Sequence, residues 1–355
     1  MKIGLLGLPR AGKTTVFSAL TRMESAAPGR SNGRVEPNVA MVKVLDERVE
    51  RLSDMYTPRK TVYATVEFVD FAGLAEGAAR DGTFASAVLG TVKTMDALTL
   101  VLRNFTDDLL GPATPLEDMR KVRDELMLLD LIVAENRLER IQKGYRRGQR
   151  TDAVVREEKT LARVVEHLNR NQPIREITLS TEEEKTIRGF QFLTRRPLMV
   201  VLNSDEAGFG NNAPLLAEIE KSFRAVEFAG KFEMELSRLE EDEAELFMED
   251  MGIRESAYSR LTTLAYETLG YISFFTVGSD EVRAWNVRRG DTAVDAAAVI
   301  HSDLAKGFIR AECFSYEDCV RLGSEKGVRE KGLFRLEGKD YRVKDGDILN
   351  IRFNV

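Results

Sequence analysis

Cysteine and histidine are almost absent from this 355-residue chain, which contains two of each. Cys313 and Cys319 are too few for the disulfide framework of a small secreted domain. No companion ligands lie near them in the sequence, so we do not expect a metal site there. The two histidines, His167 and His301, leave few side chains for acid–base catalysis near neutral pH.

Long apolar runs are also missing, and none approaches the roughly 18 residues of a membrane span. The chain is 43% hydrophobic and 31% charged, which is typical of a globular protein of two or three domains. Its N-terminus reads as a strand, so we expect no cleaved signal and a cytoplasmic location. The net charge of −6 means that any contact with nucleic acid must use local basic patches.

A phosphate-binding loop is predicted near the N-terminus. An apolar run at residues 3–6 leads into G-x-x-x-x-G-K-[ST], from Gly7 to Thr14, and a helical pattern follows. The glycines allow unusual backbone angles, and the loop N–H groups with the helix N-terminus favour an anion. Lys13 can reach the outer phosphates and Thr14 can ligate Mg²⁺. We assign the following residues to nucleotide binding: Pro9, Arg10, Ala11, Gly12, Lys13, Thr14 and Thr15.

Further along the chain, apolar runs at 66–69, 97–102 and 198–202 alternate with helical patterns. This alternation predicts a mostly parallel sheet with ligands at the carboxyl ends of its strands. Two sets of polar residues follow such strands. The first is Asp70-x-x-Gly73, in which Asp70 suits a position near Mg²⁺ and the backbone N–H of Gly73 can contact the γ-phosphate. The second contains Asn203 and Glu206, where a GTPase would carry N-K-x-D to read guanine; a polar strand-end turn is the alternative.

Between these strands the pattern becomes helical from Leu116 to about Arg170, with a break at 143–150, which predicts an inserted antiparallel hairpin. Ser180 and Glu183 form a capping box before another helix. From about Ile272, strand-like pieces at 272–277, 310–314 and 348–353 enclose a helical run at 293–306. This predicts a separate small α+β domain.

Together these motifs resemble the YchF/Obg-like ATPase family over essentially the whole chain. The residues that carry the resemblance are the phosphate loop, 36–39, 67–74, Asn203, Glu206, 281–285, 306–311, 337–341, 343–347 and 353–355. The resemblance implies a Ras-like P-loop NTPase domain (1–115 and 196–271), a helical hairpin insertion (116–195) and a C-terminal β-grasp, TGS-like domain (272–355). It also implies that ATP is tolerated or preferred over GTP, and of these we favour a preference for ATP; it further implies slow hydrolysis and association with ribosomes. Our assignment of the nucleotide site adds Gly73, Ala229 and Gly230, and Thr14 with Asp70 for Mg²⁺.

The chain departs from this family where hydrolysis is concerned. Leu74 stands where Ras-type GTPases carry the glutamine that orients the attacking water. The family's loop histidine has no counterpart in the shortened segment after Phe105. The switch-I threonine aligns with Arg34, which cannot ligate a cation, and the switch-II glycines align with Asp81, Thr83 and Ala85. We therefore leave the catalytic residues unassigned and expect very slow hydrolysis or none.

Residues 137–163 contain nine Lys or Arg and four Asp or Glu, a local charge of about +5. The tip, with Lys143, Arg146, Arg147 and Arg150 around Tyr145, offers phosphate contacts to RNA or the ribosome, although solvated helix faces look similar. A second basic surface is expected in the TGS-like domain. We predict a monomeric, nucleotide-dependent ribosome or RNA factor. The alternative is a non-switching binding or scaffold protein that holds nucleotide as a structural ligand, and a metabolic kinase ranks third.

Overall fold

The structure, a computed structural model, describes residues 1–21, 30–31, 34–35, 37–71, 90–239, 241–250, 253 and 255–354. It divides into two compact units. The first contains Met1–Met41 and Glu67–Leu264, and the second contains Val42–Val66 and Ala265–Val355. The predictions for Gly73, Leu74, Asp81, Thr83, Ala85 and the Arg34 side chain fall outside the described residues.

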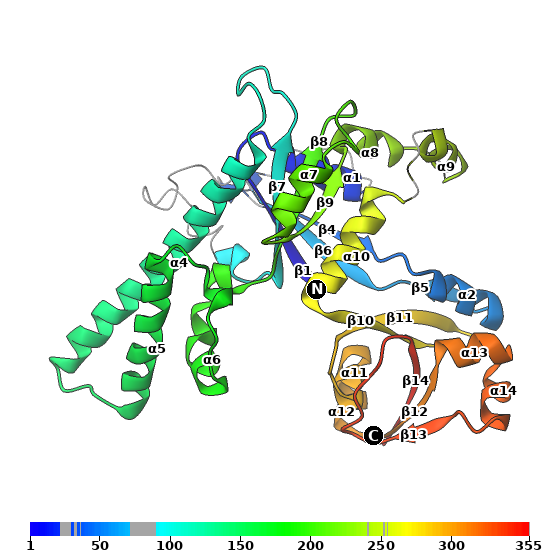
Figure 1. Cartoon of the computed structure of the whole chain (residues 1–355). Helices are drawn as coiled ribbons and strands as arrows, with labels where there is room; N and C mark the ends of the chain where they lie inside the picture. The colour runs from blue at the N-terminus through cyan, green and yellow to red at the C-terminus, as the bar shows by residue number, and fades with distance from the viewer. Residues whose placement is uncertain are drawn as a thin grey trace. The chain divides into compact units, whose positions relative to one another are not determined.

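The first unit is built on a six-stranded sheet in the order β4-β6-β1-β7-β8-β9 (Figure 1). The strands are β1 (Lys2–Leu6), β4 (Asn38–Lys43), β6 (Thr65–Asp70), β7 (Ala97–Asn104), β8 (Leu198–Ser204) and β9 (Arg224–Phe228). β1 pairs in parallel with β6 and β7, and β8 pairs in parallel with β7 and β9. The predicted parallel sheet is therefore confirmed, and the carboxyl ends of these five strands share one edge.

Helices cover this sheet, whose central strands are largely apolar and almost completely buried. All residues of β8, and all of β7 except Asn104, are buried, as expected for strands covered on both faces. The described helices of this unit outside the hairpin region are α1 (Lys13–Thr21), α7 (Ala213–Glu220), α8 (Gly230–Leu236), α9 (Glu241–Asp250) and α10 (Ala257–Leu269), the last of which continues into the second unit. No helix in the described ranges is both long and apolar enough to cross a membrane.

The predicted helical hairpin is confirmed as α4 (Pro115–Tyr145) and α5 (Asp152–Asn169), which run side by side (Figure 1). The break falls where the sequence predicts it, and Thr151 caps the start of α5. The first half of α4 contributes Val122, Leu126 and Leu129 to the core on the sheet. The next helix, α6 (Thr181–Ile187), begins with the predicted capping box at Ser180 and Glu183.

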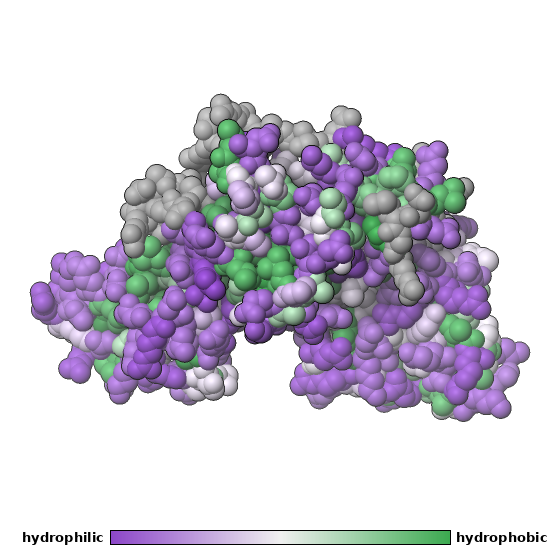
Figure 2. All heavy atoms as spheres, turned by 45° about the horizontal axis from the view of Figure 1, so that its top comes forward, coloured by the Kyte–Doolittle hydropathy of each residue, from purple (hydrophilic) through white to green (hydrophobic). Residues whose placement is uncertain are grey.

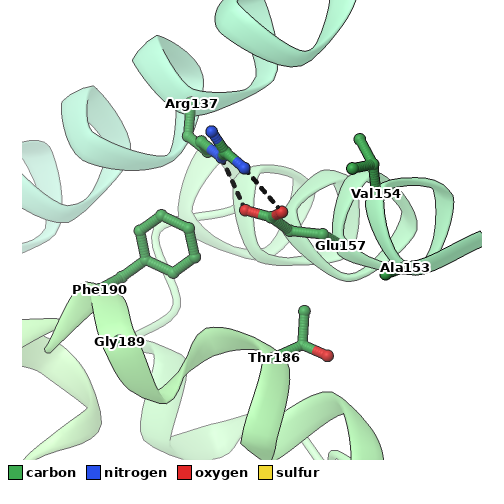
Figure 3. Close-up of a pocket in the computed structure, with 7 residues that line it drawn as sticks. All are labelled: Arg137, Ala153, Val154, Glu157, Thr186, Gly189 and Phe190. Atoms are coloured by element: carbon green, nitrogen blue, oxygen red, sulfur yellow. Dashed lines mark hydrogen bonds and ion pairs between the residues drawn. The ribbon is translucent and has the colours of Figure 1, made fainter. Parts of the chain in front are cut away.

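Polar contacts connect the hairpin with the segments that follow it and connect its two helices with each other. Asp130 of α4 accepts hydrogen bonds from Leu193 N (2.8 Å), Thr194 N (2.7 Å) and Thr194 Oγ1 (2.7 Å), at the short helix η3 (Leu193–Arg195). A cavity of about 550 Å³ lies beside α5 and α6, with a side-on pair between Arg137 and Glu157 in its wall (Figure 3). Its lining residues are Arg137, Ala153, Val154, Glu157, Thr186, Gly189 and Phe190.

The second unit is a mixed sheet in the order β13-β12-β14-β10-β11-β5. Its strands are β5 (Lys60–Val62), β10 (Tyr271–Thr276), β11 (Glu281–Arg288), β12 (Phe308–Ser315), β13 (Arg335–Glu337) and β14 (Asp347–Phe353). β10 pairs antiparallel with β11 and parallel with β14, which is the pairing of a β-grasp fold. The predicted β-grasp domain is confirmed.

Helices of this second unit pack on that sheet or connect its strands. They are α2 (Glu47–Tyr56), α11 (Ala293–Ile300), α12 (Ser302–Lys306), α13 (Tyr316–Leu322) and α14 (Glu325–Glu330). The helical run predicted at 293–306 is two helices, because His301 has an extended backbone and its Nδ1 accepts a hydrogen bond from Asp303 N (3.2 Å). Helical periodicity continues across this break, so the sequence pattern did not reveal it.

Residues 42–66 belong to the second unit, although we expected all of 1–115 in the nucleotide-binding domain. β5 extends the β-grasp sheet by pairing in parallel with β11. Arg48 of α2 forms an ion pair with Asp345 (2.9 Å), and its guanidinium lies over the Phe275 ring. These contacts join residues more than 200 positions apart in the chain, which local sequence patterns cannot predict.

Candidate nucleotide-binding site

The loop between β1 and α1 has the backbone of a phosphate cradle. Gly12 has a φ of 86°, in the left-handed region that favours glycine, and a Cβ there would lie 2.1 Å from Asn203 Nδ2. A Cβ on Gly7 would lie 2.5 Å from the carbonyl oxygen of Val101. Both glycines of the motif are therefore required by close packing, in agreement with the prediction from the sequence.

Lys13 lies at the start of α1 and is almost completely buried. Its Nζ donates to the carbonyl oxygens of Gly7 (3.1 Å) and Leu8 (2.9 Å), so the ammonium group lies over the loop. Burial lowers the pKa of Lys13 to about 8, and the nearby Asp70 partly opposes that effect. An anion in the loop would compensate the ammonium group more fully than two carbonyl groups do.

Thr14 and Asp70 meet at the same edge of the sheet. The Thr14 hydroxyl donates to Asp70 Oδ2 (3.1 Å), while Asp70 Oδ1 is buried and reaches no hydrogen-bond donor among the described residues. Burial raises the pKa of Asp70, against the effects of Thr14 and Lys13. A hydroxyl and a carboxylate with one unpartnered oxygen are the ligands that Mg²⁺ prefers, so these residues fit the metal.

Asn203, at the end of β8, joins three parts of the site. Its Nδ2 donates to the carbonyl oxygen of Ala11 (3.1 Å), and its Oδ1 accepts from Gly230 N (3.1 Å). Ala229 and Gly230 are buried beside it at the start of α8. The structure thus brings Asn203, Ala229 and Gly230 to the phosphate loop, although they are about 190 residues or more from it in the chain.

Glu206 is exposed, in the turn that follows β8, and its side chain forms no hydrogen bond with the described residues of this cluster. Ser204 occupies the place of the lysine in N-K-x-D and is buried. Its hydroxyl donates to Glu227 Oε1 (2.6 Å) and accepts from Asn104 Nδ2 (3.0 Å). Glu227 also accepts from Gly210 N (3.1 Å), so this network holds the loop after β8. Sequence reasoning missed the network because Glu227 follows no recognised motif.

The segment after β7, where the resemblance led us to look for a histidine, is a tight turn. Arg103 is buried and donates to the carbonyl oxygens of Phe105 (2.8 Å), Gly111 (2.7 Å) and Pro112 (3.0 Å). Asp107 accepts from the backbone N of Leu109 (3.0 Å) and Leu110 (3.1 Å) inside the turn. The Arg103 guanidinium and the Asp107 carboxylate therefore both stabilise the turn through hydrogen bonds to its backbone. Its described side chains include no histidine.

Arg10 of the phosphate loop reaches this turn. Its Nε lies 3.1 and 3.0 Å from the two Asp107 carboxylate oxygens, and its Nη2 lies 2.9 Å from Oδ2. The Arg10 guanidinium holds the pKa of Asp107 below its usual range. Of the residues predicted for the site, Pro9 and Arg10 are exposed, whereas Ala11 and Lys13 are buried. Gly73 falls outside the described residues.

Taken together, a parallel sheet, a glycine-bounded loop before α1 and the Thr14–Asp70 pair at the same edge define a P-loop nucleoside-triphosphate-binding protein of the Ras-like kind. Comparison with known proteins gives the family. The C-terminal domain family of YchF GTPases, described as a protein of unknown function, matches residues 271–354.

Full-length relatives match as well. "Ribosome-binding ATPase YchF" of Haemophilus ducreyi is 38% identical, over 100% of this chain and 99% of the relative. The Bacillus subtilis protein of the same name is 34% identical over 99% of both chains. The structure of the Schizosaccharomyces pombe YchF GTPase matches with a TM-score of 0.84 and 28% identity, over 99% of this chain and 97% of that one. The chain belongs to the YchF family.

Proposed function

We propose that this protein binds a Mg²⁺–purine nucleotide, with ATP favoured over GTP, and acts as a cytoplasmic factor on the ribosome or on RNA. The observation that carries the proposal is the cluster of the buried Lys13 and Asp70 with the half-buried Thr14 at the phosphate loop. The names of its relatives, which are ribosome-binding ATPases, support the ribosomal part.

In this proposal Thr14 and Asp70 hold the metal, which neutralises charge on the outer phosphates. Lys13, Gly12 and the other loop residues from Pro9 to Thr15 hold the phosphates, and Gly73 belongs to the same group. Asn203, Ala229 and Gly230 lie on the side where the base binds. Glu206 accepts a hydrogen bond from the adenine amino group, which a guanine base does not offer at that position.

Titration with ATP and GTP in the presence of Mg²⁺ tests the base preference. We expect tighter binding of ATP, and we expect Glu206→Ala to reduce the ratio of the two affinities. Asp205→Ala is a matched control, because Asp205 lies in the same turn and its carboxylate accepts only from Gly208 N among its described contacts. Equal affinities for ATP and GTP in the parent protein would contradict the assignment of Glu206.

Hydrolysis is proposed to be very slow. The described turn after β7 carries Thr106, Asp107 and Asp108 but no histidine. The Asp107 carboxylate already accepts hydrogen bonds from Arg10 and from the backbone N of Leu109 and Leu110. Leu74 in the sequence has no group that orients water. Phosphate release from purified protein measures the rate, and turnover comparable to that of a relative with the loop histidine would overturn this part of the proposal.

The hairpin tip is the proposed RNA contact. Arg146 and Arg147 are exposed and form no ion pair with a described residue, whereas Lys143 pairs with Glu139 (2.6 Å). Arg150 lies over the Tyr145 ring, and the Tyr145 hydroxyl donates to Glu158 (2.9 Å). Tyr145 therefore packs within the tip, and the arginines supply the phosphate contacts. The hairpin surface is mostly hydrophilic (Figure 2). The TGS-like domain is the second proposed ribosome contact.

Co-sedimentation with ribosomes tests this surface. We expect the double variant Arg146→Glu/Arg147→Glu to lose binding. Lys185→Glu/Arg188→Glu, which makes the same charge change on exposed residues at α6 and just after it, should retain binding. Retained binding by the tip variant would contradict the assignment. Equal binding with ATP, ADP and no nucleotide would favour the alternative, a monomeric scaffold with a structural nucleotide.

A further inference from the structure

An arginine in an unusual backbone conformation lies inside the phosphate loop. Arg10 has a φ of 64°, in the left-handed region that residues other than glycine rarely adopt. Non-glycine residues held in this region are concentrated at functional sites, where surrounding contacts maintain them. The side chain of Arg10 forms an ion pair with Asp107, 97 residues further along the chain.

The geometry of this pair leaves part of the guanidinium free. Asp107 binds the edge formed by Nε and Nη2. A guanidinium has five N–H donors, so the edge formed by Nη1 and the second Nη2 hydrogen remains. Arg10 makes no other hydrogen bond to a described residue, and its side chain is 49% exposed. An arginine can therefore hold a carboxylate on one edge and a phosphate on the other.

Asp107 is well fixed for this task. Its carboxylate also accepts from two backbone N–H groups of the turn, and its backbone pairs with Gly111 in both directions (3.1 and 2.7 Å). Its side chain is only 11% exposed. The buried Arg103 stabilises this turn by donating hydrogen bonds to three of its backbone carbonyl oxygens. Because the carboxylate is fixed, it determines where the more exposed guanidinium lies.

We propose that Arg10 binds the outer phosphates of a nucleoside triphosphate through its free guanidinium edge, and that Asp107 is the positioning residue that orients it. This inference rests on the proposed function, because it assigns a role within the same phosphate site. A triphosphate carries one phosphate group more than a diphosphate, so an added cation at the loop favours the triphosphate. Arg10 is then a specificity-determining residue that stabilises charge rather than orienting water.

Calorimetric titration with Mg²⁺ and either a non-hydrolysable ATP analogue or ADP tests the proposal. Loss of a charge-assisted pair predicts that Arg10→Ala weakens binding of the analogue by about tenfold or more and binding of ADP by less than about threefold. Arg10→Lys should lose nearly as much, because an ammonium group cannot present two edges. Asp107→Asn should weaken binding of the analogue less than Arg10→Ala does, because the guanidinium of Arg10 is still present and only its orientation is lost.

Arg137→Ala is the matched control. Arg137 binds Glu157 through the same Nε and Nη2 edge (2.7 and 2.9 Å), but in the hairpin (Figure 3). We expect this variant to bind both nucleotides as the parent protein does.

If Arg10→Ala loses affinity equally for the analogue and for ADP and has a lowered melting temperature, the Arg10–Asp107 pair only stabilises the fold, and the proposal is overturned. An Arg10→Lys variant that binds like the parent protein would overturn the two-edge arrangement, and it decides the matter if Arg10→Ala does not fold. A parent protein that binds neither nucleotide would instead defeat the proposed function itself.

Discussion

Asp70 and Asp130 are both almost completely buried in the first unit, each 2% exposed, but their surroundings differ. Asp130, at the base of the hairpin, accepts three hydrogen bonds from η3. Asp70, at the phosphate loop, has side-chain hydrogen bonds with Thr14 and Asn38, but its Oδ1 has no donor among the described residues. A buried carboxylate with all its partners stabilises a fold, whereas one that lacks a partner indicates a place for a ligand.

The largest effect that this comparison predicts is on stability. Asp130→Ala leaves three buried donors without an acceptor, so it should lower the free energy of unfolding by about 3 kcal/mol or more. Urea unfolding followed by circular dichroism measures it. Asp124→Ala, at an exposed position on the same helix, should cost less than about 0.5 kcal/mol. A small cost for Asp130→Ala would remove the distinction between the two carboxylates.

Asp70→Asn should show the reverse pattern. The free energy of unfolding should change by less than about 1 kcal/mol, because the substitution removes a buried charge and leaves an amide that can still hydrogen-bond to Thr14 and Asn38. Mg²⁺-dependent nucleotide affinity should fall by about tenfold or more, because a metal ligand is lost. Titration with and without Mg²⁺ separates the two effects. An Asp70→Asn variant that binds Mg²⁺–nucleotide normally would contradict the metal assignment.

A smaller effect concerns pH. Burial raises the pKa of Asp130 to about 6, against its hydrogen bonds and the nearby Lys93, while Arg196 also faces this carboxylate. With a pKa near 3.8 in the unfolded chain, the folded state binds more protons between these values, so its stability falls as pH rises towards 6 and is level above that. Between pH 5 and pH 7 the loss should be about 1 kcal/mol.

Urea unfolding at both pH values measures this loss in the parent protein and in Asp130→Asn. The asparagine variant should not show it, because it has no titrating carboxyl group at this position. The same pH dependence in both proteins would assign the effect to another group.

Much of the fold follows from local patterns. The break near the hairpin tip, the capping box at Ser180 and the glycine-bounded loop depend on residues within a few positions of each other, so their physical requirements are visible in sequence. The split at His301 is equally local, but its signal is weak, because an imidazole that caps a helix resembles any polar residue within one.

By itself, the sequence predicted a phosphate loop, because strand, loop and helix follow each other directly, and it placed Asp70 near Thr14, because Asp70 ends another apolar strand of a parallel sheet. Only the tertiary structure decided that Asp107 pairs with Arg10, that Asn203 spans the loop and Gly230, and that residues 42–66 join the β-grasp unit. Those contacts join residues far apart in the chain. Their pairing depends on which strands become neighbours, and no local pattern records that choice.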